Sequence, residues 1–261
     1  MAKTSPPGFD VNYLREQVQD TYSKVAIEPG DEYHFHCGPE YAAEYLNYDL
    51  EELKKLPVEC TARFAGVGNP HLIGSIKPGD TVLDHACGAG MDLLLAAKCV
   101  GSTGKVIGVD MTPEMRECAA LAAEKAGLSD IVDIRAGLFE ELPVDDESVD
   151  VLISNGVLNL SPDKEKVFQE IYRVLKPGGK LYLADVIVKR ELTIEARSNP
   201  DIWAACIGGA MQEHEIIELA TDVGMTDCRV TDHFDCFRNT PAMEKVSKDL
   251  QVQSANFYAK K

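Results

Sequence analysis

The stretch TVLDHACGAG, residues 81–90, decides the fold of this chain. Its first residues are β-prone up to Asp84, which predicts a strand. Gly88 and Gly90 follow directly, and glycine lets the backbone turn sharply and approach a ligand closely because no Cβ intervenes. A strand that runs into a glycine-rich turn is typical of ligand sites in α/β sheets, although a simple tight turn has the same pattern.

Outward from this stretch, β-rich runs bounded by Gly, Pro or Asp recur along the chain. The predicted strands are 81–84, 105–110, 131–135, 149–154 and 180–186, with two weaker candidates at 228–231 and 254–258. Helices are predicted at 92–99, 112–126, 163–175 and 213–223. Alternating strands and helices predict an α/β, Rossmann-like fold, with a seven-stranded, mostly parallel sheet and helices on both faces.

The sequence pattern of the chain changes near residue 76. The preceding segment is irregular and rich in aromatic residues, whereas the regular alternation of strands and helices starts at Ile76. We expect residues 1–75 to form an N-terminal substrate cap. Residues 76–261 are predicted to form the ligand-binding domain, with a substrate-side insertion near 190–212.

Composition narrows the class of partner. The net charge of −17 repels phosphate backbones and anionic membranes, so we expect a small-molecule substrate, no nucleic acid and no membrane. Neither a long apolar run nor an N-terminal apolar segment is present, which favours the cytoplasm. The eight cysteines form no CxxC pair, so we expect reduced thiols and no metal site. A monomer and a homodimer are both compatible with these features.

An acidic residue marks the second predicted strand. Asp110 ends that strand twenty residues after Gly90, a position from which a carboxylate can accept the hydroxyl protons of a ribose. The fourth strand ends at Ser154-Asn155, on the same edge of the sheet. A dinucleotide would need a cradle for its diphosphate, and the 84–90 loop carries Asp84 without a Lys or Arg. The pattern therefore disfavours a dinucleotide.

In its motifs the chain resembles the class I S-adenosylmethionine (SAM)-dependent methyltransferases. The matching pieces are VLDHACGAG (82–90), VIGVD (106–110), AGLFEELP (136–143) and VLKPGGKLYLADV (174–186), in the order that the family has them. The resemblance implies SAM as cofactor, bound by the 76–261 domain. It implies that Asp84, Ala86, Gly88 and Gly90 border the methionine part of SAM and that Asp110 holds the ribose. The adenine would lie against Met111, Leu138 and Phe139, with Asn155 approaching from the fourth strand.

Two positions depart from the pattern of that family. The first glycine of the loop is replaced by Ala86, whose methyl group fits if the local φ is negative; at most a somewhat weaker affinity for SAM is then expected. Leu138 stands where many relatives carry an acid for the adenine amino group. Backbone groups can replace that contact.

A narrower resemblance is to the arsenite methyltransferases. It rests on GNPHLIGSIKPGDTVLD (68–84), GVDMTPEM (108–115), SNGVLNLSPDKEKVFQEIYRVLKPGG (154–179) and CIGGA (206–210), and more loosely on HCGPEY (36–41) and YDLEELKKLP (48–57). Trivalent arsenic is soft and prefers thiolates. The positions of the three arsenic-binding cysteines of that family are Val67, Gly156 and Cys206 here, so only the third cysteine is present.

These observations leave three hypotheses for the function. The first is a methyltransferase for a small soft nucleophile such as a thiol, in which His34 or His36 would act as the base if the acceptor carries a proton. The second is a metalloid methyltransferase that uses Cys206 with Cys37 or Cys60. The third is a SAM-binding protein without catalysis, which only Ala86 and Leu138 favour.

Overall fold

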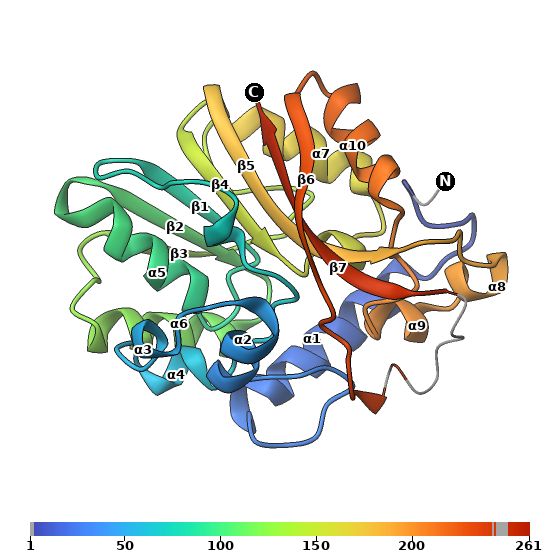
Figure 1. Ribbon diagram of the computed structural model, residues 1–261, viewed down its shortest axis with the longest axis horizontal. Helices are drawn as coiled ribbons and strands as arrows, with labels where there is room; N and C mark the ends of the chain where they lie inside the picture. Colours follow the sequence, from blue (N-terminus) through green and yellow to red (C-terminus); the bar gives the residue numbers. More distant parts are fainter. Residues whose placement is uncertain (1–2, 242, 244–249) are drawn as a thin grey trace.

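The computed structural model describes residues 3–241, 243 and 250–261 and is built around one mixed sheet (Figure 1). The seven strands of these residues lie in the order β3-β2-β1-β4-β5-β7-β6. Neighbouring strands are parallel from β3 to β5, and β7 is antiparallel to both β5 and β6. The predicted seven-stranded, mostly parallel sheet is confirmed.

The boundaries of the strands follow the sequence pattern closely. The strands are β1 (Thr81–His85), β2 (Lys105–Asp110), β3 (Val132–Ala136), β4 (Val149–Asn155), β5 (Leu175–Val188), β6 (Thr226–Phe234) and β7 (Val252–Lys260). The largest difference is β5, which begins earlier than the predicted 180–186 because Leu175 already pairs with Val149 across a register shift. Both weaker candidates form strands, and both are longer than predicted.

The described helices belong to two groups. Those of the sheet domain are α5 (Met91–Val100), α6 (Pro113–Lys125), α7 (Lys164–Val174) and α10 (Glu213–Asp222), with the 3-10 turns η2 (Gly101–Thr103) and η3 (Leu158–Leu160). Those outside it are α1 (Val11–Ile27), α2 (Pro39–Leu46), α3 (Leu50–Leu53), α4 (Val58–Thr61), α8 (Ile194–Arg197) and α9 (Pro200–Ala204), with the 3-10 turn η1 (Pro70–Leu72). The four predicted helices correspond to the first group.

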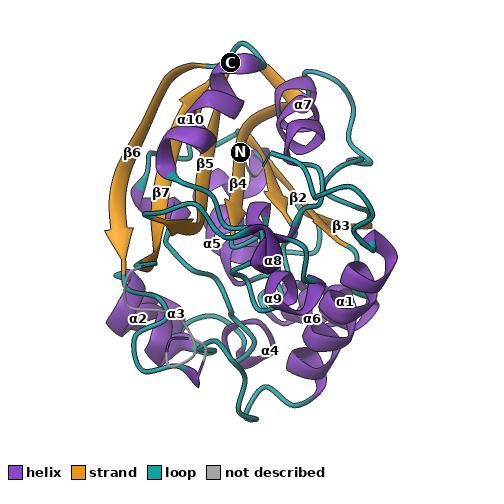
Figure 2. Cartoon of the chain, turned by 90° about the vertical axis from the view of Figure 1, so that its right-hand side faces the viewer, coloured by secondary structure: helices purple, strands orange, loops and turns teal. Residues whose placement is uncertain are grey.

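Alternation along the strands explains why helices cover both faces of the sheet (Figure 2). Successive side chains of a strand point to opposite faces. Val82 of β1 packs in one apolar cluster with residues of α5, whereas its neighbour Leu83 packs in another with residues of α7 and α10. The faces are therefore closed by apolar burial, and the carboxyl ends of the parallel strands remain for a ligand.

The N-terminal helices lie across those carboxyl ends, in the lower half of Figure 1. Val18 of α1 shares one apolar cluster with Met115 of α6 and with Trp203 of α9. The Trp203 ring is fully buried, with the Phe9 ring 5.0 Å from it. Residues 3–75 and the 190–212 region thus share a core with the sheet domain at the end where the ligand is expected.

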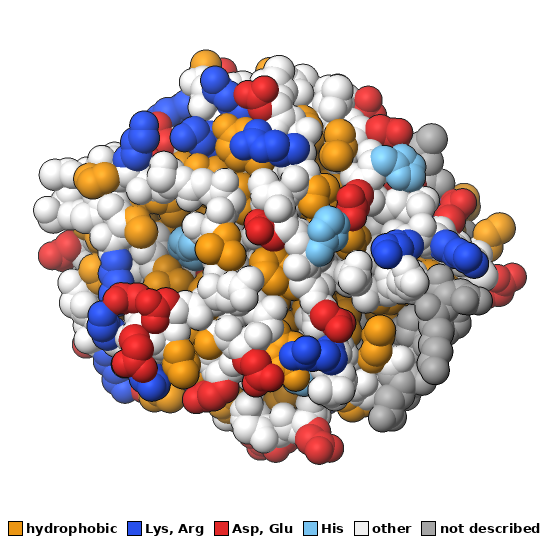
Figure 3. All heavy atoms as spheres, in the orientation of Figure 1, with side chains coloured by type: hydrophobic (Ala, Val, Ile, Leu, Met, Phe, Trp, Pro, Cys, Tyr) orange, Lys and Arg blue, Asp and Glu red, His pale blue; other side chains and the backbone are white. Residues whose placement is uncertain are grey.

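Charge is unevenly distributed over the surface. On the face of Figure 3, Lys and Arg side chains gather mostly at the top, and Asp and Glu are spread over much of the rest. Lys180 of β5 pairs with Lys260 of β7, and Arg229 of β6 stacks 4.0 Å above the Tyr258 ring. Among the helices of the described ranges, not one combines the length and apolar character that crossing a membrane requires.

Candidate active site

A pocket of about 880 Å³, a volume that includes open solvent, lies at the carboxyl ends of β1, β2 and β4. Its wall comes from α1, from residues 60–66, from the 84–92 loop, from the end of β2 and from the 155–160 segment. Of the residues predicted to bind the cofactor, all except Leu138 line it. Gly137 and Phe139, on either side of Leu138, do line it.

The glycine-rich loop has an unfavourable backbone at Ala86. Its φ is +58°, so the expectation of a negative φ is wrong. An L-residue in the left-handed region costs roughly 1–2 kcal/mol because its Cβ approaches the following carbonyl. Gly88, at φ +51°, and Gly90, at φ +91°, tolerate this region. Gly90 also lets α5 approach α6, since a Cβ there would lie 3.2 Å from the Ala119 Cβ.

Asp110 joins the glycine-rich loop to the end of β2. One of its carboxylate oxygens accepts a hydrogen bond from the Gly88 N–H at 2.8 Å, and the other accepts from the Thr112 N–H at 2.8 Å. Each oxygen keeps a lone pair for a ligand hydroxyl. Burial raises the pKa of this carboxyl, and the two backbone hydrogen bonds oppose that effect. A fixed, buried carboxylate in this position suits the hydroxyls of a ribose.

Two further carboxyl groups lie nearby, on Asp84 and Asp92. Both are buried, and the Asp84 Oδ2 atom has no hydrogen-bond partner in the described structure. Burial raises the pKa of Asp84 well above its usual value, and the charges of Asp92 and Asp110 add to that effect. A buried acceptor among other acids favours a cationic ligand, because a positive charge would offset both the repulsion and the loss of solvation.

Asn155 connects this acidic end to the N-terminal segment. Its Oδ1 accepts from the Val67 N–H at 2.8 Å, and its Nδ2 donates to an Asp92 oxygen at 3.0 Å. The Tyr48 hydroxyl donates to the other Asp92 oxygen at 2.7 Å. Asn155 therefore fixes the 66–68 backbone against α5, besides lining the pocket.

His85 supports the opposite wall of the pocket. Its Nε2 lies 3.3 Å from the Phe139 carbonyl and its Nδ1 lies 3.2 Å from the Ser154 hydroxyl. A carbonyl only accepts, so Nε2–H donates to Phe139 and Nδ1 accepts from Ser154. Burial lowers the pKa of His85 to about 4, so the ring is neutral at pH 7. The side chain thereby holds Phe139 in place and lies behind the pocket wall.

Cys206 lies behind Tyr22 at the substrate side. Tyr22 lines the pocket, and its hydroxyl lies close enough to the Cys206 sulfur to lower the pKa of that thiol. Burial raises the pKa of this thiol to about 12, and the Asp185 charge adds to the effect. Cys206 also has φ +62°, a strained value for a non-glycine residue, and such strain concentrates at functional sites.

The loop after Cys206 holds that strained conformation. Gly208 and Gly209 lie against the buried Trp203 ring, so closely that a Cβ on either would overlap it. The Lys164 ammonium lies 4.3 Å above the same ring. These contacts fix the backbone that follows Cys206, and the cysteine is held in place with it.

Val67 and Gly156, at which the resemblance implied arsenic-binding cysteines in the arsenite methyltransferases, are neighbours in space. A Cβ built on Gly156 would lie 3.4 Å from the Val67 Cγ1, an ordinary contact distance. Cys60 lines the pocket and donates its S–H to the Pro57 carbonyl, whereas Cys37 is half-buried in the N-terminal segment. Within the described residues no three His, Cys, Asp or Glu side chains are arranged to hold a metal ion.

His34 and His36 lie outside the lining of the pocket. The His36 Nε2 lies 2.8 Å from the Arg238 carbonyl, and its ring packs on Tyr41 and Tyr45. The His34 ring meets the Phe35 ring edge-on at 4.5 Å. Their proposed role as a base remains a prediction.

Sequence reasoning missed Tyr22, Asp92 and Thr112, all of which line the pocket. Asp92 left a signal, since it is an acid on an otherwise apolar helix directly after the glycine-rich turn. Thr112 left a weaker one, because it is the N-cap residue of α6 and threonine is frequent at that position. Tyr22 left none, because its place depends on how α1 packs across the sheet.

The pocket fits a ligand that carries a ribose at one end and an ammonium group at the other. Asp110 offers acceptors for the hydroxyls, and the unpartnered Asp84 Oδ2 offers one for the cation. Space for the chain between them exists at Gly88, where an added Cβ would meet nothing within 4 Å. SAM has this arrangement of groups, which fits the donor set of these residues.

Comparisons with known proteins agree with this geometry. Residues 76–224 match a family model described as a methyltransferase domain. An arsenite methyltransferase of Halobacterium salinarum is 40% identical over 70% of this chain and 46% of its own length. Another, from Aquipseudomonas alcaligenes, is 34% identical over 94% of this chain and 71% of its own length. A human arsenite methyltransferase is 36% identical over 94% of this chain and 66% of its own length. The chain thus spans between about half and 71% of these relatives.

Among solved structures, an arsenic(III) S-adenosylmethionine methyltransferase from Chlamydomonas reinhardtii superposes with a TM-score of 0.64 at 36% identity, covering 80% of this chain and 69% of the other. The strand order and the pocket define a Rossmann-like methyltransferase fold, with SAM as its cofactor. The chain belongs to the class I SAM-dependent methyltransferases and, within them, is closely related to the arsenite methyltransferases.

Proposed function

We propose that this protein transfers the methyl group of SAM to a trivalent arsenical. The observation that carries the proposal is Cys206, a buried thiol with a strained backbone that lies beside Tyr22 in the wall of the cofactor pocket. The relatives named as arsenite methyltransferases support the same substrate. Soft trivalent arsenic suits a thiol ligand.

Different residues bind the cofactor and exclude water, at opposite ends of the pocket. SAM, when bound, would supply an electrophilic methyl group on a sulfonium. Asp110 and Asp84 fix the two ends of the cofactor, and the neutral His85 holds Phe139 in place. Tyr22 and the 155–160 segment exclude water at the other end. The acceptor is the lone pair of arsenic, so no base is required, and alignment is the main contribution of the protein.

The direct test is product analysis. Purified protein is incubated with SAM, arsenite and a reducing thiol, and methylated arsenic is separated chromatographically and detected by mass spectrometry. We expect methylated arsenic in the wild type and at least a tenfold lower rate in Cys206→Ser. Tight SAM binding without any arsenic product would overturn the proposal.

A second candidate acceptor is a small organic thiol. Val67 and Gly156 favour it, because the resemblance to the arsenite methyltransferases implied arsenic-binding cysteines at these two positions. The same reaction with small thiols in place of arsenite separates the candidates. Organic methylation that persists in Cys206→Ser would favour the thiol, since an organic acceptor needs no arsenic-binding cysteine.

A further inference from the structure

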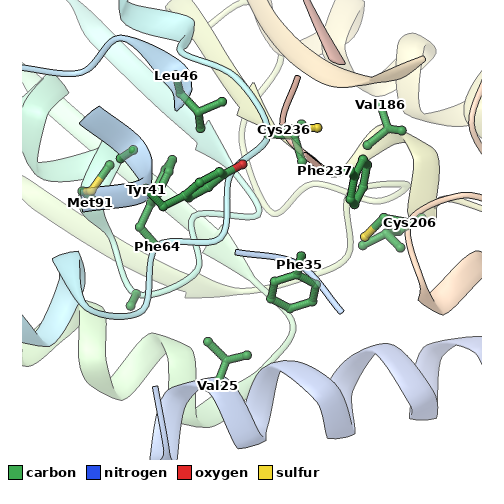
Figure 4. Close-up of a cluster of buried hydrophobic side chains, with 14 of the residues drawn as sticks. Val25, Phe35, Tyr41, Leu46, Phe64, Met91, Val186, Cys206, Cys236 and Phe237 are labelled. Atoms are coloured by element: carbon green, nitrogen blue, oxygen red, sulfur yellow. The ribbon is translucent and has the colours of Figure 1, made fainter. Parts of the chain in front are cut away.

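One buried thiol on the substrate side has no role in the site described so far. Cys236, which follows β6, is 2% exposed and packs in the same apolar cluster as Cys206. Figure 4 shows Cys206 and Cys236 on either side of the Phe237 ring. The sequence alone gave no reason to pair them, since 30 residues separate them along the chain.

Cys236 also lies beside the position of a missing family cysteine. The Ser254 hydroxyl lies close enough to the Cys236 thiol to lower the pKa of that thiol, and the same hydroxyl donates a hydrogen bond to the Val67 carbonyl. The side chain of Val67 in turn packs beside Gly156. The thiol of Cys236, in the β6–β7 connection, thus lies near the backbone of Val67.

We propose that Cys206 and Cys236 form a two-thiol site for a trivalent arsenical with at least two exchangeable hydroxyl groups. The inference rests on the proposed function and adds the residues that hold the substrate. Tyr22 forms the wall between this site and the cofactor pocket. Cys37 lies near both Tyr22 and Tyr41 and is the candidate for a third thiol.

The chemistry suits buried, neutral thiols. Each S–H proton passes to a hydroxyl group of the arsenical, which leaves as water while an As–S bond forms and an As–O bond breaks. No electron is gained or lost, and no net charge is buried. Burial raises the pKa of both thiols to about 12, so a dication that needs two thiolates would pay a desolvation penalty that the neutral arsenical avoids.

The test uses the full chain, reduced, with phenylarsine oxide as the probe, because its hydrated form carries two exchangeable hydroxyls. Native mass spectrometry counts the bound arsenical, and alkylation after unfolding followed by peptide mapping identifies the protected cysteines. We expect one arsenical on the wild type with Cys206 and Cys236 protected. In Cys236→Ser and in Cys206→Ser the affinity should fall more than 100-fold, because a chelate becomes a single bond.

Cys99→Ser is the matched control, since Cys99 is exposed on α5 and should bind the probe as the wild type does. SAM affinity within twofold of the wild type shows that Cys236→Ser is folded. Unchanged affinity for the probe in Cys236→Ser, or protection of a different cysteine pair, would overturn the site. Binding at both cysteines without methylated product retains the site and defeats the proposed function. If Cys236→Ser methylates arsenite at the wild-type rate, the proposed function is retained and the two-thiol site is overturned.

Discussion

The two ends of the pocket are built by different means. At the cofactor end, buried carboxyl groups lie at or near strand termini and accept backbone hydrogen bonds from the adjacent loop, as Asp110 does from Gly88 and Thr112. At the substrate end, thiols and aromatic rings from distant segments share an apolar cluster, as Cys206, Cys236 and Tyr41 do (Figure 4). The first end is polar and determined locally, whereas the second is apolar and determined by packing.

The difference predicts which changes affect which ligand. A substitution at the cofactor end should alter SAM binding through charge and hydrogen bonds, with an effect that depends on pH. A substitution at the substrate end should leave SAM affinity unchanged and alter turnover. A substitution at the substrate end that changes SAM affinity would show that the two ends act as one unit.

The largest effect is expected for Asp110→Ala. The substitution removes both ribose acceptors and leaves the Gly88 and Thr112 N–H groups without theirs. Two hydrogen bonds to a charged group are together worth about 3 kcal/mol, so SAM affinity should fall roughly 100-fold in isothermal titration calorimetry. Asp145→Ala, at an exposed acid outside the pocket, is the control and should bind normally. If SAM affinity fell less than threefold in Asp110→Ala, Asp110 would not be the residue that binds the ribose.

Asp84→Asn tests the charge at the same end. Because the pKa of Asp84 is raised in the free protein, the carboxyl is protonated at low pH and must lose its proton to pair with a cation. SAM affinity should therefore increase with pH up to that raised pKa and then level off, with proton release upon binding. Calorimetry in two buffers of different ionisation enthalpy measures that release. In Asp84→Asn the affinity should be about tenfold lower, and the release should disappear.

The same group links pH to stability. A carboxyl whose pKa is higher in the folded than in the unfolded state holds more protons when folded, so the free energy of unfolding falls as pH rises between the two values. The fall should be smaller in Asp84→Asn, as measured by urea unfolding across the acid range. An equal slope in both proteins would contradict the buried, ionisable state of Asp84.

Tyr22→Phe examines the boundary between the two ends. It removes the hydroxyl that lies beside the Cys206 sulfur and keeps the ring in the pocket wall. The loss of about 1 kcal/mol should lower kcat/KM for the arsenical about fivefold and leave the SAM dissociation constant within twofold. Steady-state kinetics with each substrate varied in turn separates the two. A change confined to SAM affinity would place the hydroxyl at the cofactor end instead.

The smallest effect is expected for Ala86→Gly. Glycine adopts φ +58° without the contact that strains alanine, so the folded state should gain about 1 kcal/mol. In a chain of this size the melting temperature should rise by about 2–4 °C in differential scanning calorimetry. SAM affinity should stay equal or improve. A lower melting temperature would show that the greater freedom of glycine in the unfolded chain outweighs the relieved strain.

Much of the cofactor end could be predicted from the sequence because its geometry is local. Asp84, Gly88 and Asp110 lie at the ends of strands or in the turn that follows, and parallel strands bring such ends to one edge. Leu138 was predicted to line the pocket but does not, because the choice among three consecutive residues depends on the direction of each side chain. The sign of φ at Ala86 likewise depends on the turn that tertiary contacts impose.

The sequence by itself determined the fold class, because periodicity and glycine-rich turns act over short distances, and its resemblance to the class I methyltransferases implied the cofactor. Only the tertiary structure brought Tyr22 of α1 beside Cys206 and placed Cys236 near Val67. Those pairs join segments far apart in the chain, and their proximity follows from the packing of apolar side chains across the sheet ends. Apolar packing has no fixed spacing along a sequence, so no local sequence pattern predicts these contacts.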